Sequence, residues 1–586
     1  MVGVVTKTRL LLLAILLLTF VLHLLVVAEP FGRDQGIFAY IGNALLHGGV
    51  PYSDAWDHKT PGIYAVYALA FAAFGQAMSS VHLLEGLLLT FTSLVVFLIG
   101  RRLHSDGVGL LGALFYGLSA TLLFEWWDRG QAEIYMALTG AVAVYFLVKA
   151  FEHRPSPQAR QSATPNPSGS PQGGEGAGGA LAPGQAGGVE EAAFHASHLF
   201  VALSGAFCGL TIYFKPSGAP LLAGMALAIV LLLWSGGRGR VLRTLAALGL
   251  GFALSFVPLF VYFAANGALN DLYQTVIVFN TYHARIGGNP TLAGILTGTL
   301  DFSISMNILT PLALVGLWLV LRPDEELAAL PAGMEQDERQ RRQRLALVIP
   351  IWLVASAAGI WTQGKFFSYH WSPVLPPLAL LAAWGAAGIA RELRRLHDER
   401  NRALVLLVCA AVLAVYVAAL GRDHAPKWVR DASYLLGQTS RQQFLANFGH
   451  DIQQRDRYSF SETQQAADYL RAHSAPDDYV YVWGFQSLVN YLADRRSPTR
   501  YVFNYPLTFD RPEVDFRVQA RRTFLQDLQQ RPPAYIVLVS NDVNPLQAVD
   551  SLALLPGFPE FQSLISQQYR HETDIGDFHI YRRIDA

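Results

Sequence analysis

Residues 10–28, LLLLAILLLTFVLHLLVVA, form an apolar run long enough for a helix to cross the hydrocarbon core of a bilayer, which takes about 20 residues. Lys7 and Arg9 precede the run, as basic residues precede a signal peptide, but no small-residue cleavage site follows it. We therefore expect a retained first membrane helix.

Further apolar blocks of similar length recur along the chain, and they predict eleven membrane spans in all. Only 15% of the 586 residues are charged and 52% are hydrophobic, whereas a soluble protein carries about 25% charged residues. The fold class expected is an α-helical polytopic membrane protein. The ten further spans are expected near 80–100, 108–126, 131–150, 197–214, 217–235, 242–265, 300–321, 345–361, 371–390 and 403–421.

Charge and cysteine content exclude several classes of protein. The 44 basic and 44 acidic residues balance, so no net field favours a nucleic-acid partner. Cys208 and Cys409 both lie inside apolar runs, so they predict neither a disulfide framework nor a zinc site.

Arginine placement predicts the orientation, because basic residues in short loops stay on the cytoplasmic side. The loops that are cytoplasmic with the N-terminus inside hold most of the arginines, and the alternate loops hold isolated cations. An odd number of spans then puts the C-terminus outside. We expect a multi-pass protein of the bacterial cytoplasmic membrane with a cytoplasmic N-terminus. The cations of the external loops are Arg33, Lys59, Arg129, Lys215, Arg285 and Lys365.

Two regions depart from the pattern of spans. Residues 152–196 are rich in Gly, Pro, Ser and Ala and poor in large apolar groups, which predicts a disordered cytoplasmic loop. Residues 37–47 and 61–75 are apolar but too short to cross the membrane, so we expect them in the outer interface or re-entering it partway.

The composition becomes that of a soluble domain near residue 422, so we divide the chain into a membrane domain, 1–421, and an extracytoplasmic α/β domain, 422–586. Strands are expected at 478–484, 499–503, 534–539 and 578–584, separated by helices at 461–473, 487–495 and 513–530. Tyr481, Trp483 and Tyr501 could stack on a sugar, but core packing is the favoured role for them.

Three of the six lysines, Lys59, Lys215 and Lys365, fall at expected outer ends of helices, against the positive-inside trend. Facing a shared cavity, they would make an anion site. The alternative is snorkelling of each side chain to the interface.

The first external loop, residues 29–62, places Asp34, Asp54, Asp57, His58 and Lys59 among aromatic residues close to the membrane. Asp34 is placed to point into the mouth of the helix bundle, where an acidic side chain usually faces water or substrate. The alternative is that it caps a helix starting near Ile37.

Further polar residues lie in the other external loops. Asp128 and Glu133 belong to the second loop, where an Arg129–Glu133 pair at helical spacing is one reading. His283 and His370, with Glu133 or Asp128, leave a divalent metal site open, although their spacing is not diagnostic. The fourth loop also carries Arg285, and the fifth carries Lys365 and Tyr369.

The order of these motifs carries a family resemblance. An acidic residue follows the first helix, then come GVPYSDAWDHKTPGIY at 49–64, DRGQAE at 128–133 and GKFFSYHWSPVLPPLALL at 364–381. Over about residues 10–420 the chain resembles the GT-C class of polyprenyl-phosphate-sugar-dependent membrane glycosyltransferases. It looks most like the group of protein O-mannosyltransferases and lipid A aminoarabinose transferases.

The resemblance implies roles for individual residues. Asp34 matches the catalytic base and Lys59 matches the lysine that contacts the lipid phosphate, while Asp128 and Glu133 match the acidic positions of the second loop. Arg285, Lys365, Tyr369 and His370 are then expected to help bind the donor. The family commonly has Asp-Glu in the first loop, whereas Gln35 follows Asp34 here, which leaves one carboxylate and weakens the case for a metal.

One carboxylate suffices for the implied reaction, because a polyprenyl phosphate leaves as a stabilised anion and needs cations rather than a general acid. We expect an inverting glycosyltransferase that moves a sugar from a polyprenyl-phosphate carrier to a glycan, lipid or protein acceptor. The alternatives are a transporter or lipid flippase, which would carry ionisable groups near the midplane, or an inactive scaffold.

Overall fold

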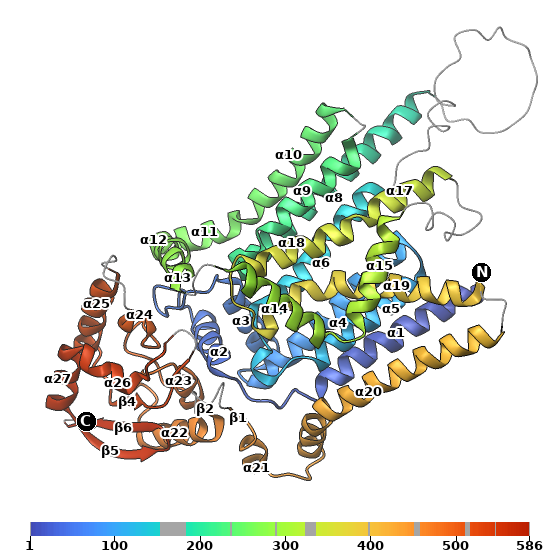
Figure 1. The fold of residues 1–586 in the computed structure, drawn as a ribbon. Helices are drawn as coiled ribbons and strands as arrows, with labels where there is room; N and C mark the ends of the chain where they lie inside the picture. The colour runs from blue at the N-terminus through green and yellow to red at the C-terminus, as the bar shows by residue number, and fades with distance from the viewer. Residues whose placement is uncertain are drawn as a thin grey trace, which may run out of the picture.

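The computed structural model describes residues 2–152, 183–234, 237–286, 290–322, 336–395, 399–450, 458–509, 516–544 and 547–584. Long apolar helices form the N-terminal part of the chain, and a small mixed sheet lies in the C-terminal part (Figure 1). This arrangement confirms the predicted fold class. The long helices are α1 (Val2–Leu24), α4 (Met78–Leu103), α5 (Asp106–Leu122), α6 (Ala132–Glu152), α8 (Pro183–Phe214), α9 (Pro220–Leu233), α10 (Arg238–Ser255), α11 (Val257–Ala265), α14 (Leu292–Ser305), α15 (Leu309–Leu321), α17 (Gln336–Ala346), α18 (Val348–Trp361), α19 (Leu375–Arg395) and α20 (Glu399–Leu435).

Eight helices among the described residues are long and apolar enough to cross a membrane, and a bent pair makes a ninth. The remaining two predicted spans, 108–126 and 403–421, correspond to the shorter apolar helix α5 and to part of α20. The span predicted at 300–321 corresponds to the bent pair α14 and α15, which meet at 106°, so this segment is a broken span or a re-entrant loop rather than one straight helix. Asn307 lies between them with φ +49°, a left-handed conformation that ends a helix.

The predicted loop 152–196 ends earlier than expected, since α8 begins at Pro183; residues 153–182 lie outside the described part. The two short apolar segments are helices, α2 (Arg33–Leu46) and α3 (Gly62–Phe74). Between α11 and α14 the chain forms α12 (Leu269–Leu272), the π-helix η4 (Tyr273–Phe279) and α13 (Asn280–Ile286).

The C-terminal sheet has the strand order β3-β4-β6-β5, with β3 (Val480–Trp483) parallel to β4 (Tyr535–Val539). β6 (Phe578–Arg583) runs antiparallel to β4, and β5 (Tyr569–Ile575) forms an edge that the sequence did not predict. The predicted strand at 499–503 is wrong, because these residues form a buried loop. The helices are α21 (Arg441–Leu445), α22 (Phe460–His473), α23 (Leu488–Ala493), α24 (Tyr505–Thr508), α25 (Phe516–Gln530), α26 (Ser551–Leu554) and α27 (Pro559–Gln568), and β1 (Gly449–His450) pairs with β2 (Tyr458–Ser459).

The C-terminal domain packs directly on the first loop and α2, at one end of the helix bundle (Figure 1). Trp56 N donates to Arg500 O at 2.7 Å, and Ser497 N donates to the Tyr40 hydroxyl at 2.8 Å. A Cβ atom on Gly36 would lie 2.6 Å from Leu488 Cβ, so α2 and α23 are in close contact. α20 runs through residue 421, where the sequence suggested a domain boundary.

Candidate active site

A cavity of about 470 Å³ lies where α2, the first two loops and the C-terminal domain meet. Most of the site residues expected from the sequence line this one space, although they come from segments far apart in the chain. The expected residues among its lining are Asp34, Lys59, Asp128, His283, Lys365, Tyr369 and His370. Lys215 lines the cavity too, so the three lysines share a cavity, as an anion site requires.

Asp34 lies in the first turn of α2, which begins at Arg33 after the N-cap residue Gly32. The positive end of the helix dipole favours a carboxylate at this position. The alternative reading, in which Asp34 caps a helix starting near Ile37, is wrong, because the helix begins earlier. The half-buried side chain faces the cavity.

Gln35, the residue that follows Asp34, is buried and hydrogen-bonded to the second loop. Its Nε2 donates to Trp127 O at 3.0 Å and to Arg129 O at 2.9 Å, and its Oε1 accepts from Gly32 N at 3.0 Å. The side chain therefore fastens the loop that carries Asp128 to the start of the helix that carries Asp34.

Hydrogen bonds to the backbone carbonyl oxygen of Lys59 hold this residue in position. The Tyr52 hydroxyl donates to Lys59 O at 2.8 Å. The Tyr64 hydroxyl lies 3.2 Å from the same oxygen and donates to Asp57 Oδ2 at 2.9 Å. Burial disfavours the charged form of the lysine, but nearby carboxylates outweigh burial and raise its pKa above the ordinary value. These carboxylates are Asp34, Glu133 and Asp57, so Lys59 is an ammonium group beside the proposed base.

Lys215 contacts Glu133, and its Nζ lies 3.1 Å from His370 Nε2. Burial is the main cause that lowers the pKa of Lys215, and the Glu133 carboxylate opposes it. The predicted Arg129–Glu133 pair is wrong: Arg129 Nε contacts Glu29 Oε2 at 2.7 Å instead. Snorkelling does not describe Lys215, since it points at a buried acid.

Lys365 contacts a histidine from another loop. Its Nζ lies 3.3 Å from His283 Nε2, and His283 Nδ1 lies 3.0 Å from the hydroxyl of Tyr505 in α24. Burial, followed by the charges of Lys59 and Lys215, lowers the pKa of Lys365 to about 8. Burial also lowers the pKa of His283 well below its ordinary value, so this ring is neutral.

The candidate metal ligands do not converge on one point. Glu133 Oε1 and His370 Nε2 are 3.5 Å apart, but the Lys215 ammonium contacts both, and His283 contacts Lys365 and Tyr505. Across the described ranges, no group of three or more His, Cys, Asp and Glu side chains is arranged to hold a metal ion. These residues do not fit a metal centre, and we derive no step through one.

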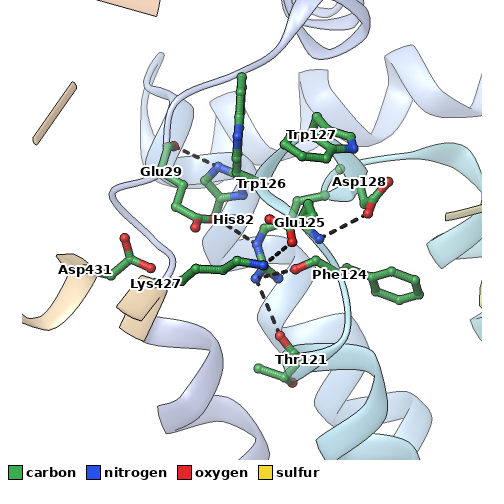
Figure 2. A network of polar contacts seen from close by, with 12 residues as sticks. Glu29, His82, Thr121, Phe124, Glu125, Trp126, Trp127, Asp128, Lys427 and Asp431 are labelled. Atoms are coloured by element: carbon green, nitrogen blue, oxygen red, sulfur yellow. Dashed lines mark hydrogen bonds and ion pairs between the residues drawn. The ribbon is translucent and has the colours of Figure 1, made fainter. Parts of the chain in front are cut away.

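Asp128 lies in the turn η1 (Trp126–Asp128), within a network of polar contacts shown in Figure 2. Its Oδ2 accepts from Glu125 N at 3.0 Å, and its Oδ1 accepts from the Ser368 hydroxyl at 2.6 Å. Burial raises the pKa of Asp128 to about 6. The carboxylate is ionised at neutral pH and can accept hydrogen bonds from a polyol in the cavity.

The lining of the cavity differs in part from the site residues that the sequence predicts. The Arg285 side chain lies outside the described part of the structure. His370 was expected to bind the donor, but its Nε2 contacts the side chains of Lys215 and Glu133. The C-terminal domain contributes Phe485 and Asn544 to the cavity lining, which no sequence pattern indicated. Tyr481, Trp483 and Tyr501 are buried, as core packing requires.

Comparisons with known proteins show which fold the chain shares. Residues 58–159 match the family model of dolichyl-phosphate-mannose-protein mannosyltransferases. The structure resembles ArnT from Cupriavidus metallidurans bound to undecaprenyl phosphate, with a TM-score of 0.53, 15% identity and 98% of each chain covered. The chain has a GT-C fold. The resemblance seen in the sequence is thereby confirmed for the fold.

Two further matches have lower scores. ArnT from the same organism in the apo state matches with a TM-score of 0.49 and 14% identity, covering 99% of this chain and 98% of that one. The archaeal oligosaccharyltransferase AglB from Archaeoglobus fulgidus, in complex with an inhibitory peptide and a dolichol-phosphate, matches with a TM-score of 0.44 and 11% identity, covering 90% and 69%. No curated protein matches the sequence.

Proposed function

We propose that this GT-C protein is an inverting glycosyltransferase that moves a sugar from a polyprenyl-phosphate carrier to an acceptor hydroxyl on the extracytoplasmic face of the membrane. The observation that carries the proposal is the composition of the cavity: the Asp34 carboxylate lies with the three lysines Lys59, Lys215 and Lys365 around a space of about 470 Å³, which Asp57 and Asp128 also line. The fold shared with an ArnT bound to undecaprenyl phosphate supports this choice of donor.

Asp34 is the base of the proposed reaction. The acceptor hydroxyl gives its proton to the Asp34 carboxylate as its oxygen attacks the anomeric carbon of the sugar. The bond from that carbon to the phosphate oxygen breaks, and its electron pair stays on the phosphate. Attack from the face opposite the leaving group inverts the configuration.

The lysines stabilise the charge that the phosphate gains as it leaves. Opposite unit charges 4 Å apart attract by about 4 kcal/mol at an effective dielectric of 20, and a dry cavity strengthens the effect. Lys59 lies closest in sequence to the base, and Lys215 and Lys365 complete the cationic wall. Asp128, with Tyr369, faces the same space and accepts hydrogen bonds from hydroxyls of the sugar.

The orientation follows the arginine distribution, which puts the cavity and the C-terminal domain on the outer side of a bacterial cytoplasmic membrane. The acceptor is a glycan, lipid or protein that reaches the cavity beside the C-terminal domain. Phe485 and Asn544 of that domain line the cavity, so the domain helps to form the acceptor side.

The test is sugar transfer by the full chain in liposomes, with defined undecaprenyl-phosphate sugars and a panel of acceptors. We expect glycoside formation by the wild type, loss of transfer with Asp34→Asn and Lys59→Ala, and retention with the control Asp54→Asn. Asp54 lies in the same loop but is exposed and is no part of the cavity lining. Undiminished transfer by Asp34→Asn would overturn the base assignment, and proton-coupled uptake without glycoside formation would favour a transporter.

A further inference from the structure

We propose that Tyr505 of the C-terminal domain is a positioning residue for the phosphate site: through His283 it holds the Lys365 ammonium group toward the cavity. The inference rests on the proposed function, because it assigns a role in binding the phosphate of the donor. It gives the C-terminal domain a defined part in assembling the site of the membrane domain.

Three side chains from three separate segments form a continuous chain of contacts. The Tyr505 hydroxyl lies 3.0 Å from His283 Nδ1, and His283 Nε2 lies 3.3 Å from Lys365 Nζ. Tyr505 and His283 are both buried, and their rings meet edge to face with centroids 5.9 Å apart. Phe279 and Phe509 pack against the Tyr505 ring, which fixes its hydroxyl at the histidine.

The protonation of Lys365 determines the tautomer of His283. An ammonium group has three donors and no acceptor, so His283 Nε2 must present its lone pair to Lys365. The neutral ring then carries its proton on Nδ1 and donates it to the Tyr505 oxygen. Without the Tyr505 oxygen, the tautomer with its proton on Nδ1 loses its hydrogen-bond acceptor. The tautomer with its proton on Nε2 then becomes more populated, and its N–H would point at the Lys365 ammonium group.

His370 and Lys215 form a second pair of the same kind in the cavity lining. His370 Nδ1 lies 2.6 Å from Lys365 O, and its Nε2 lies 3.1 Å from Lys215 Nζ. The backbone carbonyl plays the part that the Tyr505 hydroxyl plays for His283. Lys365 thus donates one hydrogen bond to His283 and keeps two N–H groups for an anion in the cavity. Lys215 contacts both His370 and Glu133, so it keeps one.

The difference between the two pairs is the origin of the outer partner. His370 is oriented by its own loop, whereas His283 is oriented by a residue more than two hundred positions away, in the C-terminal domain. The other charged groups that act on Lys365 are Lys59 and Lys215, which oppose its charge, and Asp34, which favours it. Docking of the C-terminal domain therefore favours the charged form of Lys365, which the positive charges of Lys59 and Lys215 disfavour.

The test compares Tyr505→Phe with Tyr481→Phe in the full chain. Tyr481 is a buried tyrosine of the same domain, and within the described residues its hydroxyl has no hydrogen-bond partner. We expect Tyr505→Phe to weaken binding of undecaprenyl phosphate by about threefold to tenfold, the effect of one hydrogen bond. In a plot of affinity against pH, the fall in affinity at high pH is called here the alkaline limb. We also expect this limb to move to lower pH in Tyr505→Phe, because Lys365 loses its proton more readily. Tyr481→Phe should change neither quantity.

A second pair of variants separates positioning from folding. His283→Gln can still offer an oxygen acceptor to Lys365, whereas His283→Leu cannot, so the glutamine variant should retain more affinity. If Tyr505→Phe binds undecaprenyl phosphate as the wild type does, with an unmoved alkaline limb, the inference is wrong. An equal loss at every pH, with the limb unmoved, would also overturn it, since it marks a merely structural role. If the wild type transfers no sugar, the proposed function fails instead.

Discussion

The side-chain amide of Gln35 donates a hydrogen bond of 2.9 Å to the backbone carbonyl oxygen of Arg129. The same nitrogen donates to Trp127 O at 3.0 Å, so two carbonyl groups of the second loop converge on one amide. The loop that presents Asp128 is thereby held to the helix that presents Asp34. Gln35 is therefore a structural connection between Asp34 and Asp128, two of the acidic residues that line the cavity.

Gln35→Glu is expected to destabilise the protein, although it creates the Asp-Glu pair that is common in the glycosyltransferases the sequence resembles. A carboxylate in place of the amide has no proton for the carbonyl oxygens of Trp127 and Arg129, and buried acceptors left without a donor cost about 1–3 kcal/mol each. The measurement is thermal unfolding in detergent. Gln465→Glu, on the exposed face of α22, is the matched control and should leave the melting temperature unchanged. A melting temperature of Gln35→Glu equal to that of the control would contradict this role.

Asp34→Asn should separate catalysis from binding. Loss of a general base slows transfer by about 10²- to 10⁴-fold. Affinity for undecaprenyl phosphate should not fall and should rise slightly, because removal of the carboxylate removes its repulsion of the phosphate. Lys59→Ala is expected to lower the affinity as well as the rate. Measured binding that falls with Asp34→Asn as far as with Lys59→Ala would show that Asp34 is not a base but part of the binding site.

Several elements were predictable because their signals are local. An apolar run of about 20 residues is long enough to cross the bilayer as a helix, and each predicted span coincides with helical segments of the structure. Asp34 and Lys59 were placed together because the loop between the first helix and the next span is dense in polar groups. The edge strand β5 was missed because its sequence, YRHETDI, lacks the apolar alternation of a buried strand.

The partners of buried charges were not predictable, because they depend on packing between distant segments. Arg129 and Glu133 have helical spacing, but α6 begins at Ala132, so Arg129 lies outside the helix and the spacing does not apply. Glu133 pairs with Lys215 and Arg129 pairs with Glu29, across 82 and 100 positions. The role of Tyr505 likewise depends on how the C-terminal domain docks.

Binding of undecaprenyl phosphate should weaken as the pH rises through about 8. The pKa of Lys365 is lowered to about 8, so this side chain is charged below that pH and neutral above it. An arginine keeps its charge throughout the accessible range, and Lys365→Arg should therefore move the alkaline limb to higher pH. The measurement is the affinity for undecaprenyl phosphate between pH 6 and pH 10. A limb that stays in place in Lys365→Arg would assign it to another group.

Arg129→Met tests the buried network beneath the second loop (Figure 2). Arg129 Nε contacts Glu29 Oε2 at 2.7 Å, and its Nη2 lies 3.5 Å and 3.4 Å from Thr121 O and Phe124 O. Figure 2 labels these three partners. The Arg129 side chain is 5% exposed. Glu29 Oε1 also contacts Arg430 Nη2 at 2.8 Å, so Arg129→Met leaves this carboxylate with one of its two cations. Loss of the charge-assisted hydrogen bond should cost about 1.5–3 kcal/mol. We expect a clear fall in the melting temperature.

Two comparisons decide whether that fall comes from the buried charge. Arg395→Met removes an exposed ion pair with Glu392 and should cost less than about 0.5 kcal/mol, because solvent screens such pairs. Because Arg129 and Glu29 share one contact, the double variant Arg129→Met, Glu29→Gln should lose less stability than the sum of the two single losses. Additive losses in the double variant would mean that Glu29 and Arg129 stabilise the protein independently. In that case the second loop would depend for its position on Gln35 and the contacts of Arg129 with backbone carbonyls.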